Sequence, residues 1–262
     1  MPTGATRSEL IDVNAASGAL HTYVARPDGA GPWPGVLVIQ EVFGLTDHIK
    51  AQADKLAGEG YVAVAPDLYS NDEVRATITI DEIEAAIQAT IAEDSDAAIE
   101  ALPEDQRAGV RRAFEWRGGI RTKMAGYVAD TGAIAEWIRA RDDVTTVGSI
   151  GWCMGGGVNA ALAASGAELD AASVWYGPLP QADQVANIRC PMQLHYGTAD
   201  ALAGQVPDFE KAAKSAGKDV TAFLYEDAPH AFNNEQRASY REDASRLAWE
   251  RTLAFFKERL GS

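Results

Sequence analysis

Short apolar runs alternate with longer amphipathic stretches along most of the chain. Two β-branched runs at residues 10–13 and 20–25 flank a turn at Ser17-Gly18, so they predict an antiparallel pair. The runs at 35–40 and 61–65 are almost wholly apolar, as expected for strands buried on both faces. Further strands are predicted at 145–150, 172–176, 192–196 and 220–225, and helices at about 46–58, 155–164, 203–216 and 235–260. We therefore expect an α/β fold with a mostly parallel eight-stranded sheet, helices on both faces, and the first two strands antiparallel at one edge.

Residues 70–121 interrupt this alternation. They carry no strand pattern and are too long for a simple crossover. Residues 79–102 are predicted to be helical, with a break at Pro103 before a second helical stretch. Isoleucines at helical spacing give one apolar stripe: Ile80, Ile83, Ile87 and Ile91. We expect a helical insertion that either packs on the edge of the sheet or covers the carboxyl ends of the strands as a lid. No linker separates it, so residues 1–262 are expected to form a single domain.

Composition and charge narrow the class of protein. The chain has 262 residues and a formal net charge of −15, and 47% of its residues are hydrophobic, which is an ordinary globular composition. A field this negative repels nucleic acid and anionic membrane surfaces, so neither is expected as a partner. No apolar run approaches the roughly 20 residues of a membrane span, and residues 1–7 lack the pattern of a signal peptide. Two cysteines are too few for a disulfide framework, so we expect a cytoplasmic protein with free thiols.

The strongest chemical signal is the stretch Gly151-Trp152-Cys153-Met154-Gly155-Gly156. It follows a predicted strand and opens a helix of small residues, so it matches the G-x-S-x-G nucleophile elbow with cysteine in place of serine. The turn is sharp, and glycines two residues before and after the nucleophile remove side chains that would clash. The helix N-terminus favours the thiolate. Cys153 is the candidate nucleophile, although most free cysteines are small buried hydrophobes.

A thiol nucleophile needs a base, and the chain holds four histidines. His230 follows the last predicted strand, where an α/β-hydrolase keeps its catalytic histidine. His195 is expected to be a core residue. Asp200 comes after a strand and a glycine turn, so it is the expected acid that orients the imidazole; Asp208 and Asp227 are weaker candidates. The histidines are scattered and no metal-ligand spacing is present, so we expect no metal and no cofactor.

Several short motifs point together to a known family. They are Gln40-Glu41-Val42-Phe43-Gly44-Leu45, Ala65-Pro66-Asp67-Leu68-Tyr69, the cysteine elbow, Trp175-Tyr176-Gly177 and His230-Ala231-Phe232. From about Val36 to Phe232 the chain resembles the dienelactone hydrolases (carboxymethylenebutenolidases) of the α/β-hydrolase superfamily. The resemblance implies an α/β-hydrolase fold, and the helical insertion at about 70–121 is longer than that family usually shows.

The resemblance also implies further site residues. Glu41 occupies the position of a glutamate that contacts the nucleophile thiol until substrate displaces it. The oxyanion hole maps to the backbone N–H groups of Val42 and Met154, which agrees with the usual place of such donors. Members that cleave dienelactone hold the substrate carboxylate with two arginines. For the first, rough spacing favours Arg112 over Arg111 and Arg117. The second position is Asn234, and the next arginine is Arg237. This departure, with the long acidic insertion, argues against dienelactone itself as the substrate.

We therefore expect a hydrolase of esters or lactones in which Cys153, Asp200 and His230 work through an acyl-thioester intermediate. Its partner would be a small-molecule ester or lactone, and the protein would be a monomer or homodimer. Two alternatives remain: a ligand-binding protein on a hydrolase scaffold, or a thioesterase or acyltransferase. The complete set of cysteine, aspartate and histidine argues against a pure binder.

Overall fold

The computed structural model describes residues 5–261, in which eight strands form one sheet. The strands are β1 (Thr6–Ala15), β2 (Gly18–Pro27), β3 (Trp33–Ile39), β4 (Val62–Pro66), β5 (Val144–Trp152), β6 (Ala171–Trp175), β7 (Met192–Gly197) and β8 (Val220–Tyr225). Their order across the sheet is β1-β2-β4-β3-β5-β6-β7-β8. β2 pairs antiparallel with β1 and β4, and every other pair is parallel. The predicted mostly parallel sheet with an antiparallel edge is confirmed.

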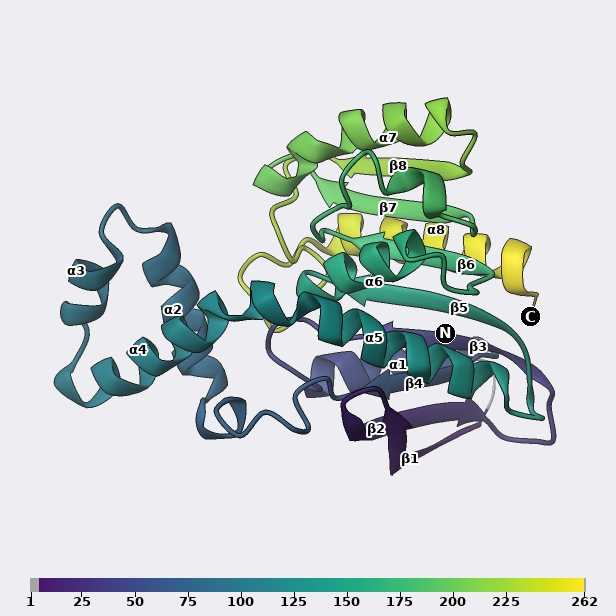
Figure 1. Ribbon diagram of the computed structural model, residues 1–262, viewed down its shortest axis with the longest axis horizontal. Coiled ribbons are helices and arrows are strands. Elements are labelled where there is room, and N and C mark those ends of the chain that lie inside the picture. The colour runs from purple at the N-terminus through teal and green to yellow at the C-terminus, as the bar shows by residue number, and fades with distance from the viewer. Residues whose placement is uncertain (1–4, 262) are drawn as a thin grey trace.

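Helices cover both faces of this sheet. They are α1 (Asp47–Gly58), α2 (Ile80–Ile91), α3 (Ser95–Glu100), α4 (Glu104–Gly118), α5 (Ile120–Arg139), α6 (Met154–Ala164), α7 (Val206–Ser215) and α8 (Glu242–Leu260). Figure 1 shows α5 and α6 in front of the sheet and α8 behind it, and α1 packs on β2, β3 and β4. β3 and β4 are buried along almost their whole length because they lie between these two layers.

The carboxyl ends of the parallel strands meet at one edge of the sheet. The loop after β3, the turn after β5 and the loops after β7 and β8 therefore lie together there, although they are far apart in the sequence. These connections carry all of the expected site residues except the arginine on the insertion. The fold thus explains why residues from 41 to 230 can share one site.

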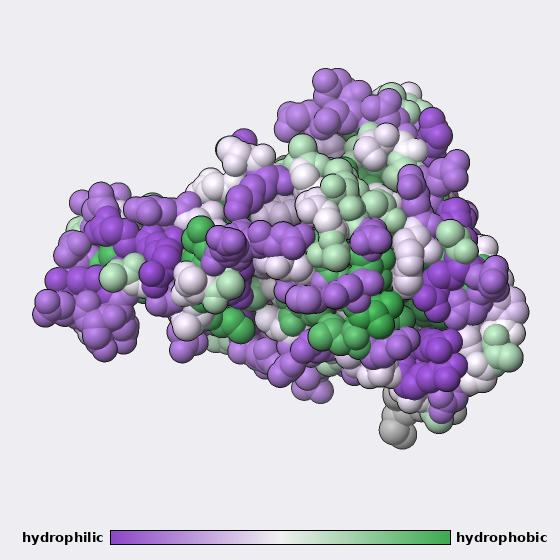
Figure 2. All heavy atoms as spheres, turned by 60° about the horizontal axis from the view of Figure 1, so that its bottom comes forward, coloured by the Kyte–Doolittle hydropathy of each residue, from purple (hydrophilic) through white to green (hydrophobic). Residues whose placement is uncertain are grey.

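The helical insertion consists of α2, α3 and α4 and ends where α5 begins at Ile120. A capping box between Thr79 and Glu82 starts α2. The insertion has a small core of its own, in which Ile83 and Ile99 are fully buried, while Ile80 and Ile91 at the ends of the predicted stripe are exposed. Its helices contact one another and α5. Figure 1 shows them standing away from the sheet, and Figure 2 shows a projecting lobe whose visible surface is largely hydrophilic. A lid function stays a prediction.

Three predicted helices differ from those in the structure. The helix expected over 79–102 is two helices, because the Asp94 side chain accepts a hydrogen bond from the Ala97 N–H and starts α3 afresh. The C-terminal helix begins at Glu242 instead of residue 235, since residues 235–241 form turns. The helix expected from 203 begins at Val206, after a 3₁₀ turn over Ala201–Gln205.

Candidate active site

Cys153 lies on a strained turn between β5 and α6. Its φ is 55°, a left-handed value that is uncommon for residues other than glycine. A Cβ on Gly151 would lie 2.3 Å from the Gly155 carbonyl oxygen, and one on Gly155 would lie 2.3 Å from the Gln40 carbonyl oxygen. The backbone N–H of Cys153 donates to Trp175 O at 3.0 Å, which fixes the turn to the end of β6. Cys153 is only partly buried.

His230 and Asp200 meet across two loops. His230 Nδ1 lies 2.7 Å from Asp200 Oδ2, and Asp200 Oδ1 accepts from the Leu202 N–H at 2.9 Å. The approach of the loops depends on Gly197, where a Cβ would lie 1.9 Å from the Ala228 carbonyl oxygen. The two weaker candidates do not bond to His230: Asp208 lies in α7, and Asp227 lies in the histidine loop, where its N–H donates to Thr198.

The imidazole of His230 also interacts with the Cys153 sulfur. Burial alone would lower the pKa of His230, but the negative form of Cys153, hydrogen bonds to Asp200 and Cys153, and the charge of Asp200 outweigh burial and raise that pKa to about 10. The imidazolium is therefore favoured beside the sulfur.

The two expected oxyanion donors lie on segments that pack together. Gly155 presses against the backbone at the end of β3, and the Tyr69 hydroxyl lies 3.2 Å from Val42 O and 3.0 Å from Met154 Sδ. Within residues 5–261, neither the Val42 N–H nor the Met154 N–H donates a hydrogen bond to another protein group. Both donors are available to an oxygen of a ligand.

Glu41 is buried and is hydrogen-bonded to Asn234, the residue that stands where the resemblance implies a second arginine. Its Oε2 accepts from Asn234 Nδ2 at 2.7 Å, and its Oε1 has no hydrogen-bond partner among the described residues. Burial raises the pKa of Glu41, against the hydrogen bond from Asn234 and the charges of Arg237 and His230. The contact with the thiol that the resemblance implied is not present as a hydrogen bond.

The three candidate arginines of the insertion have different surroundings. Arg112, which rough spacing favoured, makes no hydrogen bond or ion pair within the described chain, and Arg111 pairs with Asp96 and Glu100 inside the insertion. Arg117 interacts electrostatically with Cys153, and its Nη1 donates to Thr90 at 2.7 Å. Helical phase explains the difference, because Arg112 and Arg117 point to different sides of α4.

Two tyrosines beside the site were not singled out as site residues by the sequence reasoning. Tyr176 has a φ of 40°, its ring meets the His230 ring edge-on at 5.1 Å, and its hydroxyl has no hydrogen-bond partner among the described residues. Burial, then Glu41, Cys153 and Asp200, raise the pKa of Tyr176. Tyr69 joins the two oxyanion segments. Both tyrosines lie in motifs that carry the family resemblance, but those motifs did not indicate what either side chain does in the site.

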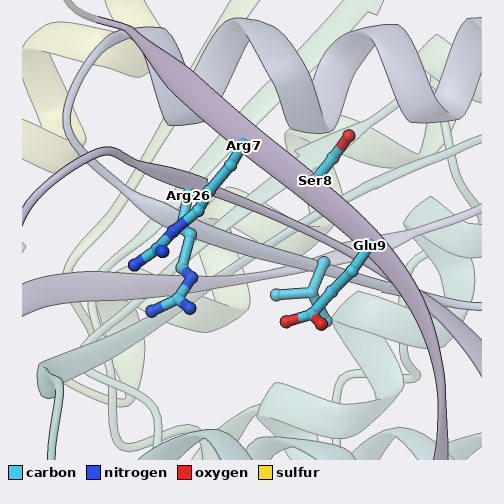
Figure 3. Close-up of a pocket in the computed structure, with 5 residues that line it drawn as sticks. Arg7, Ser8, Glu9 and Arg26 are labelled. Atoms are coloured by element: carbon cyan, nitrogen blue, oxygen red, sulfur yellow. The ribbon is translucent and has the colours of Figure 1, made fainter.

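A separate cavity of about 170 Å³ lies at the β1–β2 edge of the sheet. Figure 3 shows the side chains of Arg7 and Arg26 pointing the same way, with Glu9 beside them and Ser8 turned aside. Both arginines have partners, since Arg7 lies 3.9 Å from Asp28 and Arg26 lies 3.4 Å from Asp143. This cavity contains none of the expected site residues.

Among residues 5–261, no helix is long and apolar enough to cross a membrane. Over the same residues, no cluster of three or more histidine, cysteine, aspartate or glutamate side chains is arranged to bind a metal ion.

The fold is the α/β-hydrolase fold, and the comparisons with known proteins support a carboxylic ester hydrolase. The model of the dienelactone hydrolase family matches residues 20–260, and the chain belongs to that family. A Saccharolobus solfataricus protein named "Putative carboxymethylenebutenolidase" is 30% identical over 258 residues, covering 91% of this chain and 93% of that protein. A Methylorubrum extorquens protein of the same name is 27% identical over 260 residues, covering 95% and 80%. The crystal structure titled "Putative Dienelactone Hydrolase" from Klebsiella pneumoniae is 27% identical, with a TM-score of 0.72 and coverage of 97% of this chain and 100% of that chain.

Proposed function

We propose that this hydrolase cleaves esters or lactones through covalent catalysis by Cys153. The thiolate attacks the acyl carbon, and the Val42 and Met154 N–H groups take the negative charge that develops on the carbonyl oxygen. The C–O bond breaks as His230 gives its proton to the leaving oxygen. His230 then accepts a proton from water, the water oxygen attacks the thioester, and the thiolate leaves with release of the acid. Asp200 holds the imidazole in the required orientation.

The observation that carries this proposal is the hydrogen bond between His230 Nδ1 and Asp200 Oδ2, on an imidazole that also interacts electrostatically with Cys153. A ligand-binding protein has no need for that arrangement. We expect Cys153→Ala to abolish p-nitrophenyl acetate hydrolysis, and Asp200→Asn to lower kcat by a factor on the order of 10² or more. Cys190→Ala is the matched control, because Cys190 is buried and burial raises its pKa to about 11. Full activity of Cys153→Ala would refute the mechanism.

The acyl acceptor is a separate point. We propose water, which makes the protein a hydrolase of oxygen esters rather than an acyltransferase. Product analysis with added alcohol or thiol acceptors tests this proposal. Release of free acid as the main product is expected, whereas transfer of the acyl group to the added acceptor at a higher rate than to water would favour the acyltransferase alternative.

We propose that Arg117, in preference to Arg112, attracts a carboxylate on the substrate. Its support is the electrostatic interaction between Arg117 and Cys153. Arg117→Gln should raise KM for a carboxylate-bearing lactone by about tenfold, a loss of about 1.4 kcal/mol, and should leave p-nitrophenyl acetate nearly unchanged. Arg112→Gln, on the same helix, is the control. A larger effect from Arg112→Gln would restore the choice made from spacing.

A further inference from the structure

A buried polar contact ties the histidine loop to the oxyanion loop. Glu41 is 1% exposed and Asn234 is 2% exposed, and their side chains meet although 193 residues separate them in the chain. Asn234 is itself fixed, since its N–H donates to Ala231 O and its Oδ1 accepts from the Gln236 N–H. The side-chain amide of Asn234 is therefore fixed in position, and the hydrogen bond from its Nδ2 fixes Glu41 Oε2.

The carboxyl of Glu41 has unmet hydrogen-bonding capacity. Its Oε1 has no partner among the described residues. Glu41 and Cys153 both interact with His230, and both raise the pKa of Tyr176. A protonated thiol is a donor that could satisfy Oε1 if the carboxyl turned, and the thiol would then be drawn away from the imidazole.

We propose that Asn234 is a positioning residue that holds the Glu41 carboxyl away from Cys153, so that the sulfur pairs with His230 before substrate arrives. The inference rests on the proposed function, in which Cys153 is the nucleophile. It also assigns Asn234 a task different from holding a substrate carboxylate. Because the Val42 N–H belongs to the peptide that follows Glu41, the same contact fixes one oxyanion donor relative to the base.

Several charged and titratable groups face this contact and belong to the same balance. His230 and Arg237 act on Glu41 from the segment after β8, and Tyr176 interacts electrostatically with both Glu41 and Cys153. Cys153 also interacts with Tyr69 and with Arg117. Removal of Asn234 changes none of these groups, so a changed pH profile in its variants would report the freed carboxyl.

The test is the pH profile of iodoacetamide labelling at Cys153, read by peptide mass spectrometry. Freeing Glu41 with Asn234→Ala should slow labelling near neutral pH by about tenfold, the worth of one hydrogen bond of ordinary strength, and move the profile toward higher pH. Adding Glu41→Leu should restore the rate to within about twofold, because leucine offers the thiol no hydrogen-bond acceptor. Asn234→Leu, close in size to asparagine, repeats the test without a cavity.

Asn233→Ala is the matched control. Asn233 is equally buried, but its Nδ2 donates to Ser245 at 2.8 Å, so this change should lower the melting temperature and leave the labelling profile unchanged. Folded Asn234 variants with the wild-type profile would overturn the inference, as would a double variant that stays slow. If a His230→Ala variant showed the wild-type labelling profile at Cys153, the proposed function would be overturned as well. That result can be told apart from a failure of the inference because it does not involve Asn234.

Discussion

At the scale of single residues, the site depends on side chains that hold backbone donors in place. The Tyr69 hydroxyl reaches both Val42 O and Met154 Sδ, so one phenol joins the two segments that carry the expected oxyanion donors. Tyr69 is 5% exposed, and its ring packs edge-on against Trp116 and Tyr127. Its ring is therefore fixed by packing, and the hydroxyl alone can be removed.

We expect Tyr69→Phe to lower kcat by about tenfold with little change in KM, because the donors would be less well aligned for the transition state. The loss of the hydrogen bond should cost about 1 kcal/mol in the free energy of unfolding. Tyr127→Phe is the control, since the buried Tyr127 hydroxyl has no partner among the described residues. Equal effects of the two changes on kcat would contradict this role.

The sequence indicated candidate site residues where chemistry fixes the spacing between them. The elbow placed Cys153, and the loops after two strands placed Asp200 and His230, which the structure brings together. The hydrogen bond between Asn234 and Glu41 could not be predicted from the sequence, because nothing near position 234 indicates a contact with a residue 193 positions away. Arg112 was favoured from its distance along the chain alone, without regard to the side of the helix on which its side chain lies. The roles of all these residues stay predictions until the variants are measured.

At the scale of elements, the insertion is joined to the site by charge. Glu84 of α2 forms an ion pair with Arg237, which follows the histidine loop, and the Arg237 guanidinium lies 4.0 Å from the centre of the Phe43 ring beside Val42. An isolated ion pair at a protein surface contributes little to the stability of the fold. This pair can nevertheless set how the insertion lies relative to the site.

We expect Glu84→Gln to leave the melting temperature nearly unchanged and to change kcat/KM for bulky esters by about fivefold more than for p-nitrophenyl acetate. The reason is that a loosened lid affects substrates large enough to contact it. Glu82→Gln is unsuitable as a control because Glu82 caps α2, so Glu93→Gln, which has no ion pair in the described chain, serves instead. Equal changes for all esters would argue against a lid.

The pattern predicted the elements of the sheet better than those of the insertion. Strands between two helical layers must be apolar on both faces, so their runs stand out. The insertion packs on itself, and two of its four striped isoleucines lie exposed at the ends of α2. Its break at Asp94 depends on one side-chain cap inside an otherwise helical stretch, and a periodicity of apolar residues cannot detect that.

At the scale of the whole molecule, buried histidines make stability depend on pH. His48 is 5% exposed and His195 is fully buried. Burial, with nearby Lys55, lowers the pKa of His48 to about 4, and burial, with Arg251, lowers the pKa of His195 to about 3. His195 is a core residue, as predicted, and bonds to Tyr225, Gln193 and Thr252.

An unfolded chain with histidines at their ordinary pKa of 6.5 binds more protons than the folded protein between pH 6.5 and about 4. The free energy of unfolding should therefore fall on acidification below pH 6.5, by up to about 1.4 kcal/mol per pH unit for each of these two buried histidines. His48→Gln should reduce this slope, as chemical denaturation at several pH values would show. Because both proteins share their carboxylates, parallel curves for the variant and the wild type would contradict the assignment.

The central claim is that the acyl group of the substrate passes through the Cys153 sulfur. It is tested most directly by quenching the enzyme with acid within milliseconds of mixing with p-nitrophenyl acetate and mapping the peptides by mass spectrometry. We expect one acetyl group on the peptide that holds Cys153, none on the peptide that holds Cys190, and no acetyl group in Cys153→Ala. Rapid release of p-nitrophenol with no acetyl group at Cys153 at any quench time, or with the acetyl group on another residue, would contradict it.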